Sequence, residues 1–418
     1  MFDKSEKLFP IKEKYVYLSH CGVSPLYARG VEREIEFAHA HAGGGSLVLH
    51  EYNDILEGLR ATAARLLDTD PANVSYHRNT SEAMSIIASG YPFEPGDEVI
   101  SYVHEYPACH YPWLVQERRG VKLVLLSDVH TEGNEHVEGR PCAWSVDELR
   151  EKITDRTRVV ALSHVQFTSG YALDLEEVSA ICREHDIDLV LDVAQSLGAL
   201  PVRPEQHGVA ACASAGWKWL MGPIATGLMY TSPELREKLQ PVMAGAEMMT
   251  QGFDYLDHSW TPHTTAKRFE YSTSPPGLVG ALEATIADVH LRYSPEEIRD
   301  EILRLQDLFL EHLDTEVIAP VRFERRHRSG ILALDTLRSD PDELADALLE
   351  EGFVCSERGH YLRFAPHFYI EDDDAVRFAE TLNRLAHERE PRLAPATRHG
   401  KAPRVSEDEG ALSRARGH

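Results

Sequence analysis

Lys218 and Asp192 are the residues whose types and spacing point most directly to chemistry. Lys218 lies between two tryptophans just before a Gly-Pro turn, and Asp192 follows the apolar run 187–191. A lysine amine forms a Schiff base with an aldehyde, and a carboxylate that keeps a pyridine nitrogen protonated lets the ring accept electrons. The pair therefore predicts an enzyme that uses pyridoxal 5'-phosphate, with Lys218 joined to the cofactor aldehyde.

The composition is typical of a globular enzyme. The chain has 418 residues, of which 43% are hydrophobic and 27% charged, enough for one large and one smaller domain. A net charge of −25 argues against binding to nucleic acid or to an anionic membrane. No apolar run approaches the roughly 20 residues of a membrane helix, and residues 1–7 do not resemble a signal peptide. We therefore expect a cytoplasmic protein.

Neither the cysteines nor the histidines form a recognisable metal site. The six cysteines are scattered singly, which predicts reduced thiols rather than a disulfide framework or structural zinc. His104 and His110 flank Pro107, a helix breaker, and no carboxylate completes a ligand set. We expect no bound metal.

Strand-like and helix-like patterns alternate through the first two thirds of the chain. Apolar runs predict strands at 99–102, 121–126, 159–162 and 189–191, and amphipathic segments between them predict helices at 146–153 and 175–185. Such alternation is typical of an α/β domain with a mainly parallel sheet. A further strand at 227–230, after the lysine, is expected to be antiparallel.

The C-terminal third predicts a smaller α+β domain. A long amphipathic helix at 297–313 precedes strands at 330–334 and 361–364 and helices at 341–350 and 373–387. The N-terminal arm, with a short strand at 15–18, is expected to join this domain. The predicted division is an arm at 1–30, a large domain at 31–290, a small domain at 291–389 and a disordered tail at 390–418, which is rich in Arg, Pro, Gly and Ser.

The order of these motifs resembles the class V aminotransferase family. Asp192, Gln195 and Lys218 follow a helix start at 80–82 and precede the segment 268–270, and the resemblance runs from about Tyr15 to His387. This branch of the fold-type I pyridoxal phosphate enzymes includes cysteine desulfurases, selenocysteine lyase, kynureninase and isopenicillin N epimerase. The resemblance implies a large domain with a mainly parallel seven-stranded sheet, a smaller α+β domain and a homodimer.

The resemblance assigns roles around the cofactor ring. Lys218 would carry the cofactor and then, once the substrate amine has formed the external aldimine, remove the Cα proton. Asp192 would pair with the pyridine nitrogen and Gln195 would bind the ring hydroxyl. Tyr106 would stack on the ring, and His104 is an alternative stacker or a substrate acid.

The same resemblance places the phosphate at a helix N-terminus. The backbone of Thr80 and Ser81, one of which is expected to cap the helix, would hold it, because free N–H groups and the helix dipole favour an anion there. Ser214 would add a hydroxyl. Trp217 replaces a histidine found in many relatives and has only its indole N–H to donate. Thr273 would reach the phosphate of the neighbouring subunit.

Substrate recognition is expected from both ends of the chain. Arg363 is the first choice to grip the substrate carboxylate and Arg358 the second, although either can instead be a surface residue. The turn that contains His20 and Cys21 resembles the segment that closes over the substrate in relatives. Gln166 would take over the polar contact of an asparagine that this chain replaces with Phe167.

The sequence leaves the reaction open. Loss of a β leaving group gives a lyase, reprotonation at the cofactor gives transamination, and reprotonation at Cα gives epimerisation. Between Arg358 and Arg363 there is no cysteine of the kind that some desulfurases use, which disfavours a persulfide relay. We therefore expect a C–S or other β-lyase, or a specialised biosynthetic enzyme. A catalytically silent binding protein with the same fold is the alternative outside enzymology.

Overall fold

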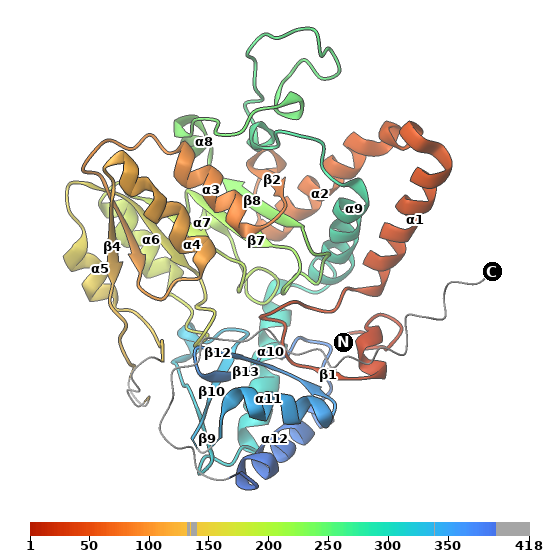
Figure 1. Cartoon of the computed structure of the whole chain (residues 1–418), viewed down its shortest axis with the longest axis vertical. Coiled ribbons are helices and arrows are strands. Elements are labelled where there is room, and N and C mark those ends of the chain that lie inside the picture. Colours follow the sequence, from red (N-terminus) through yellow and green to blue (C-terminus); the bar gives the residue numbers. More distant parts are fainter. Residues whose placement is uncertain (132–133, 135–139, 338, 390–418) are drawn as a thin grey trace.

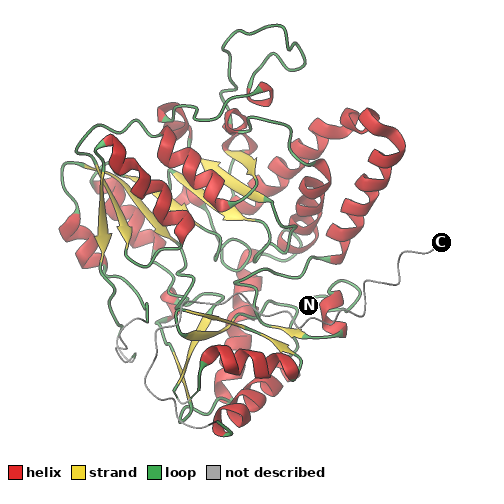
Figure 2. Ribbon diagram, viewed as in Figure 1, coloured by secondary structure: helices red, strands yellow, loops and turns green. Residues whose placement is uncertain are grey.

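Two larger sheets with their helices, and a two-stranded sheet to which the N-terminal arm contributes, make up the described part of the chain. The computed structural model describes residues 1–418 except 132–133, 135–139, 338 and 390–418, so the tail predicted at 390–418 lies outside the described residues. A seven-stranded sheet occupies the upper part of the view, and a smaller four-stranded sheet lies below it (Figure 1, Figure 2).

The seven-stranded sheet is almost entirely parallel. Its strands, in spatial order, are β2 (Val74–His77), β8 (Gly227–Thr231), β7 (Ala211–Ala215), β6 (Asp188–Asp192), β5 (Thr157–Ser163), β3 (Glu98–Tyr102) and β4 (Lys122–Leu126). Only β8 runs against its neighbours, β2 and β7. The predicted α/β class and the antiparallel strand after the lysine are confirmed.

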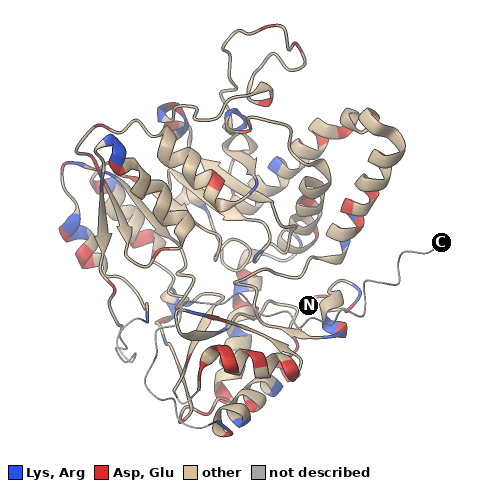
Figure 3. Ribbon diagram, viewed as in Figure 1, with Lys and Arg blue, Asp and Glu red and all other residues tan. Residues whose placement is uncertain are grey.

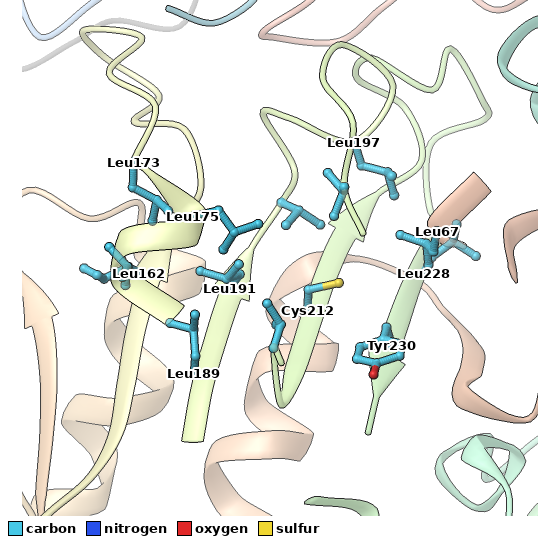
Figure 4. Close-up of a cluster of buried hydrophobic side chains, with 14 of the residues drawn as sticks. Leu67, Leu162, Leu173, Leu175, Leu189, Leu191, Leu197, Cys212, Leu228 and Tyr230 are labelled. Atoms are coloured by element: carbon cyan, nitrogen blue, oxygen red, sulfur yellow. The ribbon is translucent and has the colours of Figure 1, made fainter. Parts of the chain in front are cut away.

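Helices cover both faces of this sheet because its strands are apolar on both sides. Leu189 and Leu191 of β6 enter the core on one face (Figure 4), whereas Val190 enters the core on the other, with Met84 of α3. The period of two continues to Asp192, which therefore points toward the α3 side. The covering helices are α1 (Ala28–Gly44), α2 (Tyr52–Leu67), α3 (Thr80–Gly90), α4 (Pro107–Leu114), α5 (Val146–Lys152), α6 (Leu175–Glu184), α7 (Pro204–His207), α8 (Pro233–Lys238) and α9 (Pro276–Thr285).

The smaller sheet is antiparallel and packs against three helices. Its strands are β12 (Ser356–Arg358), β13 (Tyr361–Phe364), β10 (Leu332–Thr336) and β9 (Ile318–Pro320). Acidic residues gather on one of its helices, α11, in Figure 3. The three helices are α10 (Pro295–Glu311), α11 (Pro341–Glu350) and α12 (Asp372–His387).

The N-terminal arm joins this second half of the molecule. Its strand β1 (Val16–Tyr17) pairs in parallel with β11 (Phe353–Val354), and Ser19 forms a bridge with Ala365. This pairing carries the turn at 20–22 from the arm to the edge of the large sheet.

Two local predictions need correction. The strands β2 and β7 were not expected, since β7 is a run of small residues rather than of large apolar ones. The cap of α3 is Asn79 and not Thr80 or Ser81, because the Asn79 side chain accepts the Glu82 N–H at 2.8 Å. In the part of the chain that the structure describes, no helix combines the length and apolarity needed to span a bilayer.

Candidate active site

The predicted site residues lie where strands of the large sheet end. Tyr106 follows β3, Gln166 follows β5, Asp192 ends β6 and Lys218 follows β7, while α3 begins just after β2. Parallel strands bring their carboxyl ends to one edge, which is where ligands bind in open α/β sheets. The fold therefore gathers residues that are far apart in sequence.

Lys218 and Asp192 form the electrostatic centre of this edge. Burial lowers the pKa of the Lys218 ammonium and raises the pKa of the Asp192 carboxyl, and in both groups the charge of the other opposes the shift. Asp192 also accepts the Ala194 N–H at 2.9 Å. The Lys218 Nζ lies 5.2 Å from the centre of the Tyr106 ring, so the aromatic face and the amine adjoin one another.

Tyr106 is set in place by the start of α4. It precedes Pro107, which occupies the first turn of that helix, and its ring contacts Phe167 edge to face at 5.2 Å. About two fifths of Tyr106 stays exposed (42%), so a planar ligand has access to it. His104 lies in the turn before it, partly buried, with its ring 5.6 Å from that of Tyr102.

Gln195 links the sheet edge to the N-terminal turn. Its Nε2 donates to the Cys21 carbonyl at 2.9 Å, and its Oε1 accepts the Trp219 indole N–H at 3.0 Å. A primary amide has two N–H groups, so one donor remains for a ligand.

Gly198 lets the segment after Gln195 pack closely against the loop that carries Lys218. Its φ is +103°, and a Cβ there would come within 2.6 Å of the Trp219 carbonyl carbon. Only glycine suits this position.

The residues predicted to hold a phosphate lie at the start of α3 and on β7. Thr80 is buried and Ser81 exposed at the helix N-terminus, where backbone N–H groups have no partner within the helix. The Ser214 hydroxyl is buried and donates to the Ala215 carbonyl at 3.0 Å. Trp217 is partly buried in the lysine loop.

Arg363 is a buried cation that forms no ion pair within the part of the chain that the structure describes. It is 2% exposed, its two terminal nitrogens donate to the Phe167 carbonyl and the Ser356 hydroxyl at 2.8 Å each, and its Nε is buried without a partner. Among the described residues no carboxylate forms an ion pair with it. Burying a charge in this way is costly unless an anion completes the site. Burial accordingly lowers its pKa.

The other predicted substrate residues differ in exposure. Arg358 is exposed and donates to the Glu357 carbonyl at 2.9 Å, yet its charge, like that of Arg363, lowers the pKa of Lys218. His20 is fully buried, and its ring nitrogens bond to the Ala365 carbonyl and the Tyr369 hydroxyl at 2.8 Å each. The protein thus occupies both ring nitrogens of His20, and the histidine anchors its turn.

Two thiols lie near the arginine. Cys21 is buried, with its sulfur 3.9 Å from the Ser356 hydroxyl, and it interacts electrostatically with both Lys218 and Arg363. Cys355 lies between β11 and β12, and burial raises its pKa to about 12. A thiol with so high a pKa is a poor nucleophile at neutral pH.

Glu105 and Ser163, which sequence reasoning did not single out, also lie at this edge. The Glu105 carboxylate is buried beside Tyr106 and accepts hydrogen bonds from Ser163 and Gln166. The sequence held a signal for Glu105, because it follows the end of β3 by three residues and adjoins a candidate stacking residue, a kind of position that parallel sheets use for chemistry.

Thr273 lies at the surface, on the segment that precedes α9. It is exposed and lines a surface hollow of about 690 Å³ with Phe37, Val48 and Pro276. It also lines a smaller hollow with His77, Arg78 and Glu82, which flank the start of α3.

The residues at this edge fit pyridoxal phosphate and an amino acid. The buried Gln166 Oε1 and Arg363 Nε have no partner within the described protein, and an amine, a carboxylate and an aromatic face adjoin them. Fold and site together define a fold-type I pyridoxal phosphate enzyme.

The sequence itself identifies the family. Residues 16–378 match the profile of the class V aminotransferases, "Aminotransferase class-V", so the chain belongs to that family and is a pyridoxal phosphate-dependent enzyme. The predicted family, fold and cofactor are confirmed.

Relatives and solved structures extend over most of the chain. A probable cysteine desulfurase of Methanothermobacter thermautotrophicus is 25% identical, over 90% of this chain and 96% of its own length. Cysteine desulfurase CsdA of Escherichia coli is 29% identical, over 73% of each protein. The cystine C-S lyase C-DES in complex with cysteine persulfide superposes with a TM-score of 0.82 at 20% identity, covering 92% of this chain and 100% of C-DES.

Proposed function

We propose that this enzyme is a β-lyase that breaks the bond between Cβ and a sulfur or another leaving group of an amino acid. The observation that carries the proposal is the buried Arg363, which forms no ion pair among the described residues, at the same edge as Lys218 and Asp192. Such a cation suits a substrate that brings its own carboxylate.

The residues that would hold pyridoxal phosphate come from five segments. Asp192 would pair with the pyridine nitrogen, Tyr106 would cover one ring face, and Gln195 would offer its remaining N–H to the ring hydroxyl. The N-terminus of α3, at Thr80 and Ser81, would bind the phosphate, supported by Ser214 and by the Trp217 indole. Gln166 would add a polar contact through its free oxygen.

The substrate proton would pass to the Lys218 amine. Bound pyridoxal phosphate supplies an electron sink that stabilises negative charge at the substrate Cα. Because burial and the neighbouring arginines lower its pKa, Lys218 spends more time as the free amine that a general base requires. Arg363, with Arg358 nearer the solvent, would hold the carboxylate so that the Cα–H bond faces this amine.

A β-lyase is favoured over the other outcomes by the relatives and by the thiols. The two quoted relatives are described as desulfurases and C-DES as a cystine C-S lyase, all of which break C–S bonds. The Cys355 thiol, whose pKa is raised to about 12, is poorly suited to a persulfide relay. Transamination and epimerisation on the same scaffold are the competing outcomes of the test below.

The proposal includes a homodimer. The exposed Thr273 beside an apolar hollow suits a contribution to the phosphate site of a second copy, and sedimentation equilibrium with and without cofactor would measure the assembly. A monomer at micromolar concentration would contradict this part.

Absorbance tests whether the cofactor binds to Lys218. The purified protein with added pyridoxal phosphate should show the visible band of a lysine-bound cofactor, and borohydride should abolish that band and fix the cofactor to Lys218 in a peptide map. Attachment to another lysine, or no band at all, would instead favour the silent binding protein.

Product analysis separates the reactions. The holoenzyme should be incubated in deuterium oxide with cysteine, cystine, selenocysteine, serine and alanine. A β-lyase releases sulfide, selenide or a persulfide together with pyruvate and ammonia, so that the leaving group, carbon skeleton and nitrogen of the substrate are all accounted for. Keto acid without loss of the β substituent would indicate transamination, and Cα deuteration with racemisation would indicate epimerisation; either result would overturn the lyase proposal.

A further inference from the structure

Glu105 is a buried carboxylate that the proposed chemistry has not used. It is 7% exposed, and its Oε1 accepts the Ser163 N–H at 2.7 Å and the Gln166 Nε2–H at 3.0 Å. Its Oε2 accepts the Ser163 hydroxyl. Three donors from the end of β5 and the loop behind it therefore converge on one side chain of the neighbouring β3 loop.

The carboxylate decides which way the Gln166 amide faces. An ionised carboxylate only accepts hydrogen bonds, so the amide must turn its NH₂ group toward Glu105. Its oxygen then points away and is buried without a partner among the described residues, in a side chain that is 1% exposed. A buried acceptor left unsatisfied costs about 1–3 kcal/mol, so a donor from outside the protein would be favoured there.

The residue after Gln166 connects it to the candidate ligand site. Phe167, the next residue, packs its ring on Tyr106 at 5.2 Å, and the Phe167 carbonyl accepts from Arg363 at 2.8 Å. The Lys218 amine lies 5.2 Å from the same Tyr106 ring. Gln166 is thus next to the segment that joins the lysine, the stacking residue and the carboxylate-binding arginine.

We propose that Glu105 is a positioning residue that holds the Gln166 amide so that its oxygen accepts an N–H or O–H donor of the ligand bound at Lys218. The inference rests on the proposed function, since it needs a ligand at that amine. It differs from direct contact, because Glu105 acts only through Gln166.

The charges around Glu105 make this orientation depend on pH. Burial raises its pKa to about 7, with a smaller contribution from Asp192 on β6, whereas the bonds from Ser163 and Gln166 oppose the rise. The facing groups Tyr102 of β3 and Cys109 of α4 have raised pKa values and remain neutral at pH 7. Asp192 interacts in turn with the charge of Lys218. Once Glu105 is protonated, it no longer forces the NH₂ group of Gln166 toward itself.

A double-mutant cycle tests the inference on the holoenzyme. The variants are Glu105→Gln, Gln166→Leu and both together, assayed for kcat, KM and the dissociation constant of the cofactor by absorbance. Each single change should raise KM or the dissociation constant of the cofactor about tenfold. In the double variant neither constant should be higher than in Gln166→Leu alone. Losses that multiply would overturn the inference, because Glu105 would then act independently of Gln166.

Glu98→Gln is the matched control. Glu98 is also a buried carboxylate of β3, but at the opposite end of the strand, where it accepts the Thr154 hydroxyl at 2.6 Å. Its KM and cofactor affinity should equal those of the wild type. An equal effect of Glu98→Gln would show that any loss of buried charge suffices and would refute the inference.

Two further readouts keep the inference falsifiable. If Glu105→Gln does not fold, Ser163→Ala serves instead, because it removes one hydrogen-bond donor to Glu105. Ser163→Ala should raise KM by less than Glu105→Gln would, and this increase should disappear in the Gln166→Leu background. An increase that remains there would count against the inference.

The pH dependence of KM is the second readout. In the wild type KM should rise as pH falls through about 7, and Gln166→Leu should not show this rise. Wild-type protein without bound cofactor would sink the proposed function, whereas an active wild type unaffected by Glu105→Gln would sink only this inference.

Discussion

Two buried arginines, one on α2 and one on β13, are treated very differently by the fold. Arg60 is 5% exposed and forms ion pairs with Glu57 at 2.6 Å and with the buried Glu270. Arg363 is 2% exposed and has only neutral partners among the described residues. The first is balanced by two ion pairs, whereas the second forms no ion pair among the described residues, and the effect of burial on its pKa is only partly offset by the charge of Glu357.

The difference separates structure from ligand binding. A balanced buried pair holds segments together, and breaking it leaves an isolated charge. A buried cation held only by neutral groups already carries the free-energy cost of an unpaired buried charge. An anionic ligand would therefore lower its free energy more than that of a cation that is already paired. The lack of an ion pair at Arg363 therefore supports the proposal that this residue binds a substrate carboxylate.

The largest effect is expected at another cation, the partly buried Lys218. Lys218→Ala should lower kcat by a factor of about 10³ or more, because both the attachment point and the base are lost. Rapid-mixing and steady-state assays would measure it, with Lys267→Ala as a control at a lysine away from this edge. Turnover within tenfold of the wild type would break the assignment of the site.

Arg60 should matter for stability. Arg60→Ala leaves Glu270 buried and unpaired, at a cost of about 3–5 kcal/mol in the free energy of unfolding measured with urea. Glu57→Gln, which removes the exposed partner, should cost about 0.5 kcal/mol or less. Equal costs for the two variants would mean that Arg60 is not held by its buried partner.

Arg363 should matter for binding instead. Arg363→Leu should raise KM about 100-fold, equivalent to about 2.7 kcal/mol, and change the free energy of unfolding by less than about 1 kcal/mol. Arg358→Ala, at an exposed position, should raise KM only about threefold. A large loss of stability in Arg363→Leu would show that the fold, and not the substrate, requires this guanidinium.

Glu105 extends the comparison to buried carboxylates. Its pKa is raised from 4.5 to about 7 in the folded protein, so between these values the native state binds more protons than the unfolded state. Stability should therefore fall as pH rises from 4.5 to 7, by on the order of 2–3 kcal/mol relative to Glu105→Gln. Urea denaturation of both proteins across this range measures the difference, and parallel curves would contradict the raised pKa.

The sequence predicted those parts of the fold in which apolar period and residue type agree. Strand β6 is a clear example, because a run of Leu and Val ends in Asp192, and the helix at 341–350 was located residue for residue. Strand β7 was missed because Ala, Cys and Ser at 211–215 carry little apolar signal; its place in the sheet comes from pairing with β6 and β8.

The sequence allowed single residues of the candidate site to be chosen, but not the contacts between them. Lys218, Asp192 and Tyr106 could be chosen by type and position, and the structure brings them together. The contact between Glu105 and Gln166 joins positions separated by 61 in sequence, and it depends on the neighbouring ends of β3 and β5. Nothing in either local pattern specifies that contact.

The anchoring of the N-terminal turn by residues near the C-terminal end of the described chain has a consequence for biosynthesis. His20 leaves the ribosome early, but the Ala365 carbonyl that holds its ring lies 345 positions later. The seven strands of the large sheet can assemble while translation continues. The part of the site proposed to bind substrate needs β11, β13 and the segment that follows them, which are synthesised later. A nascent chain can therefore acquire its cofactor edge well before it is able to process an amino acid.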